Sequence, residues 1–346
     1  MNSAPWPNPT GLKGVEFVEF AGTDPAFYAQ IFSRFGFEKM GQIKDKQIEL
    51  YRQNNINFIV NYQPGSFAWE FARQHGPSIC STGFRFANAA QGHREAVGRG
   101  GVKFDGQSEV HPFPSIFGIG SSLIYFADGE SIRNFYSQNF HVEADQKPLG
   151  RGFQVIDHFT NNVPAGEMQK WCDFYTRVFA FRETRYFDIK GAKTGLISKV
   201  MRSPCDSFAV PINEPSDSKS QIQEYLDEYR GSGIQHLALL TSDIIQSLEA
   251  MKDAHVEFLT PPPTTYYKML TERLPNIRED ISRLQKDAVL ADGDSEGYLL
   301  QIFTKNSVGP IFFELIQREN HSGFGEGNFQ ALFDAIERDQ QERGYL

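Results

Sequence analysis

The chain has 346 residues, with 34 Lys and Arg against 43 Asp and Glu, so its formal net charge is −9. This acidic balance argues against binding to nucleic acid or to an anionic membrane, because either partner needs a basic face on the protein. No apolar run approaches the length of a spanning helix, no signal-peptide pattern opens the chain, and the three cysteines form no CxxC pair. We therefore expect a cytoplasmic globular protein.

The two halves of the chain repeat the same order of predicted elements. Alternating apolar and polar residues predict a strand that begins near Gly14 in the first half and near Gly152 in the second. Apolar residues at helical spacing follow each strand, over residues 27–35 and 168–179. Late in each half comes a strongly apolar strand, SSLIYFAD in the first and GPIFFELIQR in the second.

This repetition predicts an α+β fold built from paired βαβββ modules, whose curved sheets form concave surfaces. A polar stretch over residues 141–152 is the best boundary between the halves. We therefore expect two domains, which span residues 1–145 and residues 150–346.

A further helix is predicted near the C-terminus, with Asn328 as its N-cap. The glycines before it predict a flexible approach, which suggests a lid over a pocket, although a rigid helix that only completes the core would fit the same pattern. Its predicted apolar stripe consists of Phe329, Leu332, Phe333 and Ile336.

Three residues on separate predicted strands of the second half form a candidate metal site. They are His158, His236 and Glu314, the ligand set of a 2-His-1-carboxylate facial triad. Two imidazole nitrogens and one anionic oxygen suit Fe(II) and leave positions open for substrate and O2. A single strand His is more often a hydrogen-bonded core residue, but a Glu among Phe and Ile is costly to bury without a partner.

The repeat alignment sets Phe20, Phe86 and Tyr125 opposite these three residues, in that order. Since none of the three is a metal ligand of the same kind, the first half is predicted to be a structural copy and the chain to bind one metal ion. Five other histidines have polar neighbours in the sequence and are predicted to lie at the surface: His75, His93, His111, His255 and His321. No Ser/His/Asp or Cys/His signature predicts covalent catalysis.

The second half resembles the 4-hydroxyphenylpyruvate dioxygenase family of the vicinal-oxygen-chelate group. The matching motifs are GFQVIDHFTNNV, VPINEP, SQIQEYL, GSGIQHLAL, TPPPTTYY, GYLLQIFTK, FFELIQR and SGFGEGNFQALFDAIERDQQERG. They run in order from residue 152 to the C-terminus, whereas the first half resembles the family's non-catalytic domain only loosely.

The resemblance implies an enzyme that converts 4-hydroxyphenylpyruvate and O2 to homogentisate and CO2 in tyrosine and phenylalanine catabolism. It implies one Fe(II) per subunit on His158, His236 and Glu314, and a homo-oligomer, either dimer or tetramer. The family's polar substrate-side residues fall on Ser198, Asn213, Gln221, Gln235 and Gln301. Its aromatic walls fall on Phe303, Phe312, Phe324 and Phe329.

Gln235 is the weakest of these assignments, because strict strand alternation turns it away from the face that carries His236. Two alternative functions stay open at this stage. A 4-hydroxymandelate synthase would share the iron site and the substrate, but the intact PINEP motif with Asn213 favours ring hydroxylation. A non-catalytic small-molecule binding protein could use the same fold, but it would not need the metal ligands.

Overall fold

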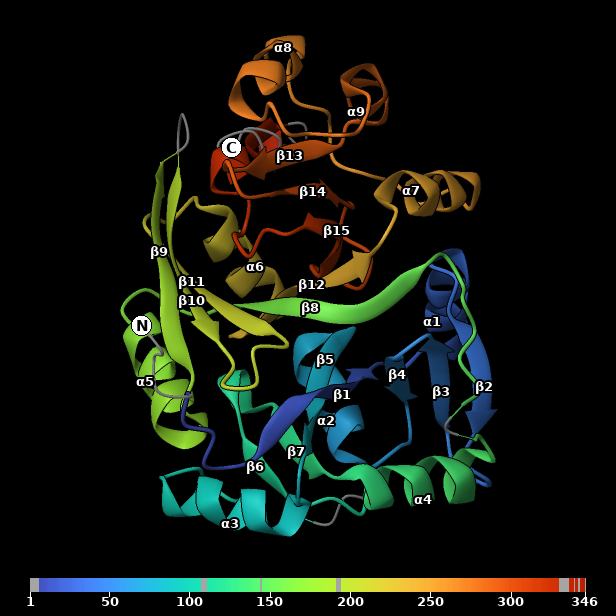
Figure 1. The fold of residues 1–346 in the computed structure, drawn as a ribbon. Coiled ribbons are helices and arrows are strands. Elements are labelled where there is room, and N and C mark those ends of the chain that lie inside the picture. Colours follow the sequence, from blue (N-terminus) through green and yellow to red (C-terminus); the bar gives the residue numbers. More distant parts are fainter. Residues whose placement is uncertain are drawn as a thin grey trace.

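The structure is a computed structural model that describes residues 6–106, 111–143, 145–190, 194–329, 336–338, 340–341 and 343–345. Its strands form two mixed sheets, one of seven strands and one of eight (Figure 1). Within the described ranges, none of the helices combines the length and the apolar character needed to cross a membrane.

The first sheet and its helices come from the first half of the chain. The strands are β1 (Leu12–Ala21), β2 (Glu38–Gln42), β3 (Ile48–Gln53), β4 (Ile56–Asn61), β5 (Ser78–Phe86), β6 (Ser115–Phe117) and β7 (Leu123–Ala127). The α-helices are α1 (Pro25–Arg34), α2 (Phe67–His75), α3 (Ala89–Gly98) and α4 (Gly129–Phe140). The strand order is β2-β3-β4-β1-β5-β7-β6.

The second sheet and its helices come from the second half. The strands are β8 (Phe153–Asn162), β9 (Arg182–Lys190), β10 (Gly195–Arg202), β11 (Ala209–Pro215), β12 (Gly233–Thr241), β13 (Leu290–Gly293), β14 (Tyr298–Phe303) and β15 (Phe312–Glu319). The α-helices are α5 (Met168–Phe179), α6 (Gln221–Tyr229), α7 (Ile244–Asp253), α8 (Thr264–Arg273) and α9 (Ile281–Asp287). The strand order is β13-β14-β15-β12-β8-β11-β10-β9.

The predicted α+β fold of paired βαβββ modules is confirmed. In the second half, one module is β8-α5-β9-β10-β11 and the other is β12-α7-β13-β14-β15, with β8 and β12 antiparallel where they meet. The helices α8 and α9 are inserted into the last module, and they lie above β13 at the top of Figure 1. This insertion was not predicted from the sequence.

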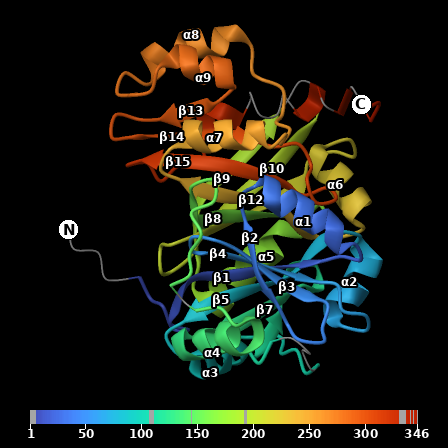
Figure 2. The ribbon, with the colours of Figure 1, turned by 90° about the vertical axis from the view of Figure 1, so that its right-hand side faces the viewer.

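The main core lies between the two sheets and their helices. Phe84 on β5 packs against Phe159 on β8, with 6.2 Å between ring centroids, and against Phe208 at 5.2 Å. Figure 2 shows the strands of the two halves in successive layers, with α3 and α4 at one end of the molecule and α8 and α9 at the other. Phenylalanine side chains therefore pack at the contact between the two halves, and the burial of their aromatic area stabilises this contact.

The face of each sheet opposite the main core is packed in the first half and hollow in the second. In the first half, Phe135, Tyr136 and Phe140 of α4 pack into a second apolar cluster with Phe17 and Tyr125 of the sheet. In the second half, the corresponding face is hollow and carries the predicted metal ligands. A short 3-10 helix, Glu326–Asn328, lies at this face and contacts β13.

Candidate metal centre

Three neighbouring strands bring the predicted metal ligands together. Ala238 on β12 is the register partner of both His158 on β8 and Glu314 on β15, and His236 precedes Ala238 by two residues. Residues two apart in a strand share a face, so all three side chains lie on the hollow side of the sheet. One potential ligand atom from each residue lies within 4.8 Å of the others.

The distances within this triad are short and the groups are buried. His158 Nε2 lies 3.1 Å from Glu314 Oε2, and His236 Nε2 lies 3.6 Å from the same oxygen. Glu314 is only 1% exposed. A carboxylate buried to this degree requires a positive partner, and a divalent cation between the three groups would provide one.

The electrostatics of the two histidines differ. Burial, together with the nearby His158, lowers the pKa of His236 well below its usual value, so His236 is a neutral imidazole. Burial opposes protonation of His158 as well, but the Glu314 and Asp157 carboxylates outweigh it and raise the pKa of His158 to about 9. The triad therefore fits a metal ion such as Fe(II), which takes neutral imidazole and carboxylate ligands and displaces the proton.

Each ligand also has a supporting hydrogen bond. His158 Nδ1 lies 2.8 Å from Asp157 Oδ1, His236 Nδ1 lies 3.3 Å from Gln235 Oε1, and Gln301 Nε2 donates to Glu314 Oε1 at 2.9 Å. Of these partners, Asp157 was not predicted from the sequence, although it directly precedes His158 within the GFQVIDHFTNNV motif. Such partners orient ligands and tune their basicity.

A cavity of about 90 Å3 opens at the triad. All nine residues that the sequence placed on the substrate side line it, as do Phe187, Ile189 and Leu196, which the sequence did not single out. Apolar and aromatic groups dominate its wall, with a few amides and the hydroxyls of Thr160 and Ser198 among them. This combination is typical of sites for small aromatic ligands.

Gln235 reaches this cavity beside His236 because the pairing of β12 with β8 is irregular. The register shifts between Ile234 and His236, which breaks strict alternation at that point. Gln235 Oε1 lies 3.3 Å from His236 Nδ1. Strict alternation would turn Gln235 away from the cavity, and the bulge removes that constraint.

Gln301 already has protein partners on its side-chain amide. Besides Glu314, its Nε2 donates to the Phe324 carbonyl at 3.1 Å, and its Oε1 accepts from Asn328 Nδ2 at 3.0 Å. Asn328 in turn accepts from the Tyr266 hydroxyl at 2.6 Å. This arrangement supports the Glu314 carboxylate and ties it to the segment that contains Phe324.

Two phenylalanines of the C-terminal segment close the cavity. Phe324 lies edge-on to the ring of His158 at 5.3 Å, and Phe329 meets Phe187 at 4.6 Å. Of the predicted C-terminal stripe, Leu332 and Phe333 lie outside the described residues, and the proposed lid helix therefore stays a prediction.

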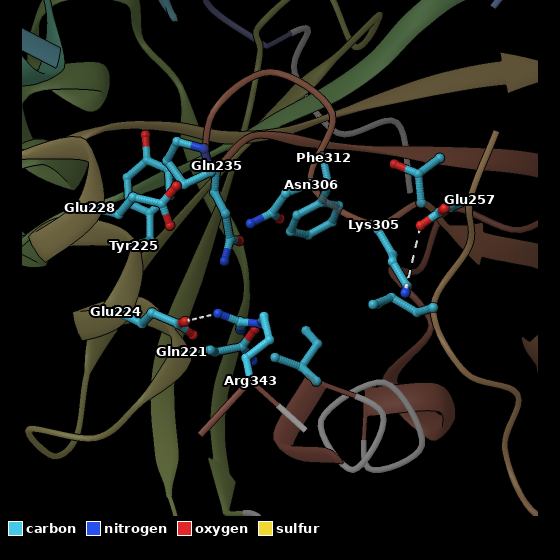
Figure 3. Close-up of a pocket in the computed structure, with 14 residues that line it drawn as sticks. Gln221, Glu224, Tyr225, Glu228, Gln235, Glu257, Lys305, Asn306, Phe312 and Arg343 are labelled. Atoms are coloured by element: carbon cyan, nitrogen blue, oxygen red, sulfur yellow. Dashed lines mark hydrogen bonds and ion pairs between the residues drawn. The ribbon is translucent and has the colours of Figure 1, made fainter. Parts of the chain in front are cut away.

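A larger chamber of about 480 Å3 borders the cavity on its outer side (Figure 3). The two spaces share Gln221, Gln235, Phe312 and Ile336. Figure 3 shows an ion pair of Glu224 and Arg343 on one side of the chamber, with Lys305 and Glu257 on the other. Polar and charged groups therefore surround the outer space, while the inner cavity is largely apolar.

The corresponding positions in the first half differ from the predicted alignment. Gly83 on β5 is the register partner of Phe17 and of Tyr125. In the same way, Ala238 is the register partner of His158 and of Glu314. The equivalents of His158, His236 and Glu314 are therefore Phe17, Ser81 and Tyr125. The prediction was right for Tyr125 and wrong for Phe20 and Phe86, because these two residues pair with Ile79 and Leu12 and do not lie at the level of Gly83.

The surface assignment of two other histidines was also wrong. His75 is buried, and its Nδ1 lies 2.7 Å from the Tyr229 carbonyl. His111 is buried at the first half's counterpart of the metal centre, where its ring lies 4.8 Å from that of Phe17 and 4.4 Å from that of Tyr125. Polar neighbours in sequence gave no sign of these tertiary partners.

His111 pairs there with a buried carboxylate. Glu19 Oε2 lies 3.1 Å from His111 Nε2, and both side chains are almost fully buried. Burial alone would raise the pKa of Glu19, but His111, together with hydrogen bonds from Ser81 and Asn61, holds it below the usual value. A buried pair of carboxylate and imidazole within the protein therefore occupies the position that a metal would take in the second half.

A Glu19→Ala variant is expected to lose about 3 kcal/mol of unfolding free energy at pH 7, because it leaves His111 buried without its carboxylate. Since folding lowers the pKa of Glu19, its contribution is present above about pH 4.3 and is lost as the pH falls further. Urea unfolding at pH 7 and at a pH below about 4.3 measures this contribution of Glu19 to the unfolding free energy. The control is Glu70→Ala, which removes an exposed pair with Arg73; equal losses in the two variants would contradict the assignment.

The fold and the site together define a class. Paired βαβββ modules with two histidines and a glutamate on the hollow face of one sheet are the features of a metal-dependent protein of the glyoxalase and dioxygenase superfamily. The family model for that superfamily, described as "Glyoxalase/Bleomycin resistance protein/Dioxygenase superfamily", matches residues 155–282. A second model, "Hydroxyphenylpyruvate dioxygenase, HPPD, N-terminal", matches residues 6–141.

Comparison with known proteins narrows the class. The chain is 49% identical to "Protein MelA" of Shewanella colwelliana, over 98% of this chain and 99% of that protein. It is 44% identical to a 4-hydroxyphenylpyruvate dioxygenase of Legionella pneumophila, over 98% of each chain. The chain belongs to the 4-hydroxyphenylpyruvate dioxygenase family.

A solved structure shares the fold at lower identity. A mutant of 4-hydroxymandelate synthase from Streptomyces coelicolor superposes with a TM-score of 0.81 at 23% identity, over 95% of this chain and 99% of that one. At this identity the likeness concerns the fold alone.

Proposed function

We propose that this protein converts 4-hydroxyphenylpyruvate and O2 to homogentisate and CO2, with one Fe(II) per subunit held by His158, His236 and Glu314. The observation that carries the proposal is the buried triad at the end of an aromatic cavity, in a chain of this family. Bound Fe(II) would supply the redox chemistry with O2 and a Lewis-acidic point for the α-keto acid.

The residues around the triad account for substrate orientation. Ser198 on β10 and Asn213 on β11 are direct register partners, and both line the cavity. Uncharged hydroxyl and amide groups can bind a phenol or a carboxylate without competing for the metal. Phe312 and Phe324 flank the two histidines, where they would contact the substrate ring and exclude water.

Gln221 and Gln235 stand between the inner cavity and the outer chamber. We assign them to the polar end of the substrate, because they are the uncharged polar side chains shared by both spaces.

Product analysis tests the proposal. Purified protein is loaded anaerobically with Fe(II), mixed with 4-hydroxyphenylpyruvate and exposed to air, and the products are separated by liquid chromatography. We expect homogentisate, with one CO2 released per O2 consumed. Formation of 4-hydroxymandelate instead would assign the chain to the synthase reaction, and substrate binding without turnover would make it a binding protein.

An Asn213→Ala variant is expected to raise KM about 2- to 10-fold, because it removes one polar contact worth about 0.5–1.5 kcal/mol. Its iron content should stay that of the unmodified protein, since Asn213 donates to Asn162 and to no metal ligand in the described structure. Gln223→Ala, on the surface of α6, is the matched control. Unchanged kinetics in Asn213→Ala would place this residue outside the substrate contacts.

A further inference from the structure

Arg318 holds the carboxylate next to a predicted iron ligand. It lies on β15 four residues after Glu314 and on the same face. Its Nε donates to Asp157 Oδ2 at 2.7 Å and its Nη2 donates to Asp157 Oδ1 at 2.8 Å, which is a two-point contact. The same Oδ1 accepts from His158 Nδ1 at 2.8 Å. Arg318 therefore fixes the group that orients the His158 ring.

An irregularity in β8 makes this contact possible. The pairing of β8 with β12 skips one residue between Ile156 and His158, so that Asp157 is the extra residue of a bulge. In a regular strand, Asp157 and His158 would lie on opposite faces. The bulge is the local feature that lets the aspartate and the histidine act at one site.

The remaining donors of Arg318 hold the segment that closes the cavity. Nη1 donates to the carbonyl of His321 at 3.1 Å and to that of Gly323 at 2.6 Å. The guanidinium carbon also lies 5.6 Å from the ring centroid of Phe324, and this ring packs edge-on against His158. The contacts therefore form a closed circuit from His158 through Asp157 and Arg318 to Phe324 and back.

Building on the proposed function, we propose that Arg318 is a positioning residue that couples the iron ligand His158 to the pocket-closing segment 321–324. One guanidinium orients the imidazole through Asp157 and also fixes the aromatic wall that faces the substrate. Only arginine has the planar fork of donors needed for both tasks, because a lysine ammonium presents a single point of charge.

A residue that only supports the metal site would affect His158 alone, whereas Arg318 is proposed to act on both His158 and segment 321–324. Asp157→Asn weakens the contact to His158 but leaves Arg318 bonded to the two carbonyls. Phe324→Ala removes the wall but leaves Asp157 in place. Arg318→Lys should affect both ends of the circuit at once.

The test combines a metal titration without substrate and an oxygen-coupling assay. We expect Arg318→Lys to raise the Kd for Fe(II), measured by chelator competition under anaerobic conditions, about 10-fold. We also expect it to consume more than one O2 per homogentisate. Asp157→Asn should change the Kd alone and Phe324→Ala the O2 ratio alone. Arg283→Lys, which disturbs an arginine bonded to Asp287 and Glu249 away from the cavity, is the matched control.

The proposal is overturned if Arg318→Lys changes neither quantity, changes only one, or only lowers the melting temperature as Arg283→Lys does. The metal titration involves no turnover, so it decides the His158 end even if the unmodified protein makes no homogentisate. In that case, hydrogen exchange of residues 321–324 in the metal-loaded protein replaces the oxygen assay. Faster exchange in Arg318→Lys than in Asp157→Asn supports the coupling, and equal exchange overturns it.

Discussion

A Glu314→Ala variant is expected to lose its bound iron and to fall to background turnover while it stays folded. The variant removes the only anionic member of the triad, and two neutral imidazoles cannot hold Fe(II) with comparable affinity. The fold should survive because His158 keeps its contact with Asp157 and because Glu314 lines a cavity and not the packed core. The same losses are expected for His158→Ala and His236→Ala.

Iron content after desalting, homogentisate formation and thermal unfolding are the three measurements. Glu319→Ala is a matched control, because Glu319 lies on the same strand and pairs with Arg278 near the surface. Retention of both iron and activity in Glu314→Ala would show that the metal is bound elsewhere.

A Gln301→Ala variant is expected to lower metal affinity about 10-fold and to reduce kcat markedly, although Gln301 is not a ligand. It leaves Glu314 Oε1 and the Phe324 carbonyl without their donor, at a cost of about 1–3 kcal/mol for each unsatisfied group. The substrate role that the resemblance implies predicts a different result, in which KM rises and metal affinity stays constant.

Metal titration together with steady-state kinetics separates these two roles of Gln301. Gln285→Ala, on the exposed surface of α9, controls for the loss of an amide side chain. A higher KM with normal metal affinity would contradict the role of Gln301 in holding the Glu314 carboxylate.

Much of the fold could be predicted because it depends on local patterns. Strand alternation near Gly14 and Gly152 and helical spacing over residues 168–179 each reflect one buried face, and their repetition identifies the modules. The three triad residues could also be predicted, because two histidines and one glutamate on separate strands form a known ligand set and β15 alternates regularly around Glu314.

Other features depend on register and on tertiary partners, which single strands do not reveal. Bulges bring Asp157 beside His158 and Gln235 to the cavity, and the pairing of β1 with β5 makes Phe17, and not Phe20, the counterpart of His158. The burial of His111 follows from Glu19, a residue far away in the sequence. Predictions based on regular strand alternation miss such shifts of register.

The most direct test of a single iron centre in the second half is anomalous diffraction from crystals of the iron-loaded protein, recorded on both sides of the iron absorption edge. We predict one peak per chain, bounded by His158 Nε2, His236 Nε2 and the Glu314 carboxylate. A peak at another position would contradict this account, as would a second peak among Phe17, Ser81 and Tyr125 of the first sheet.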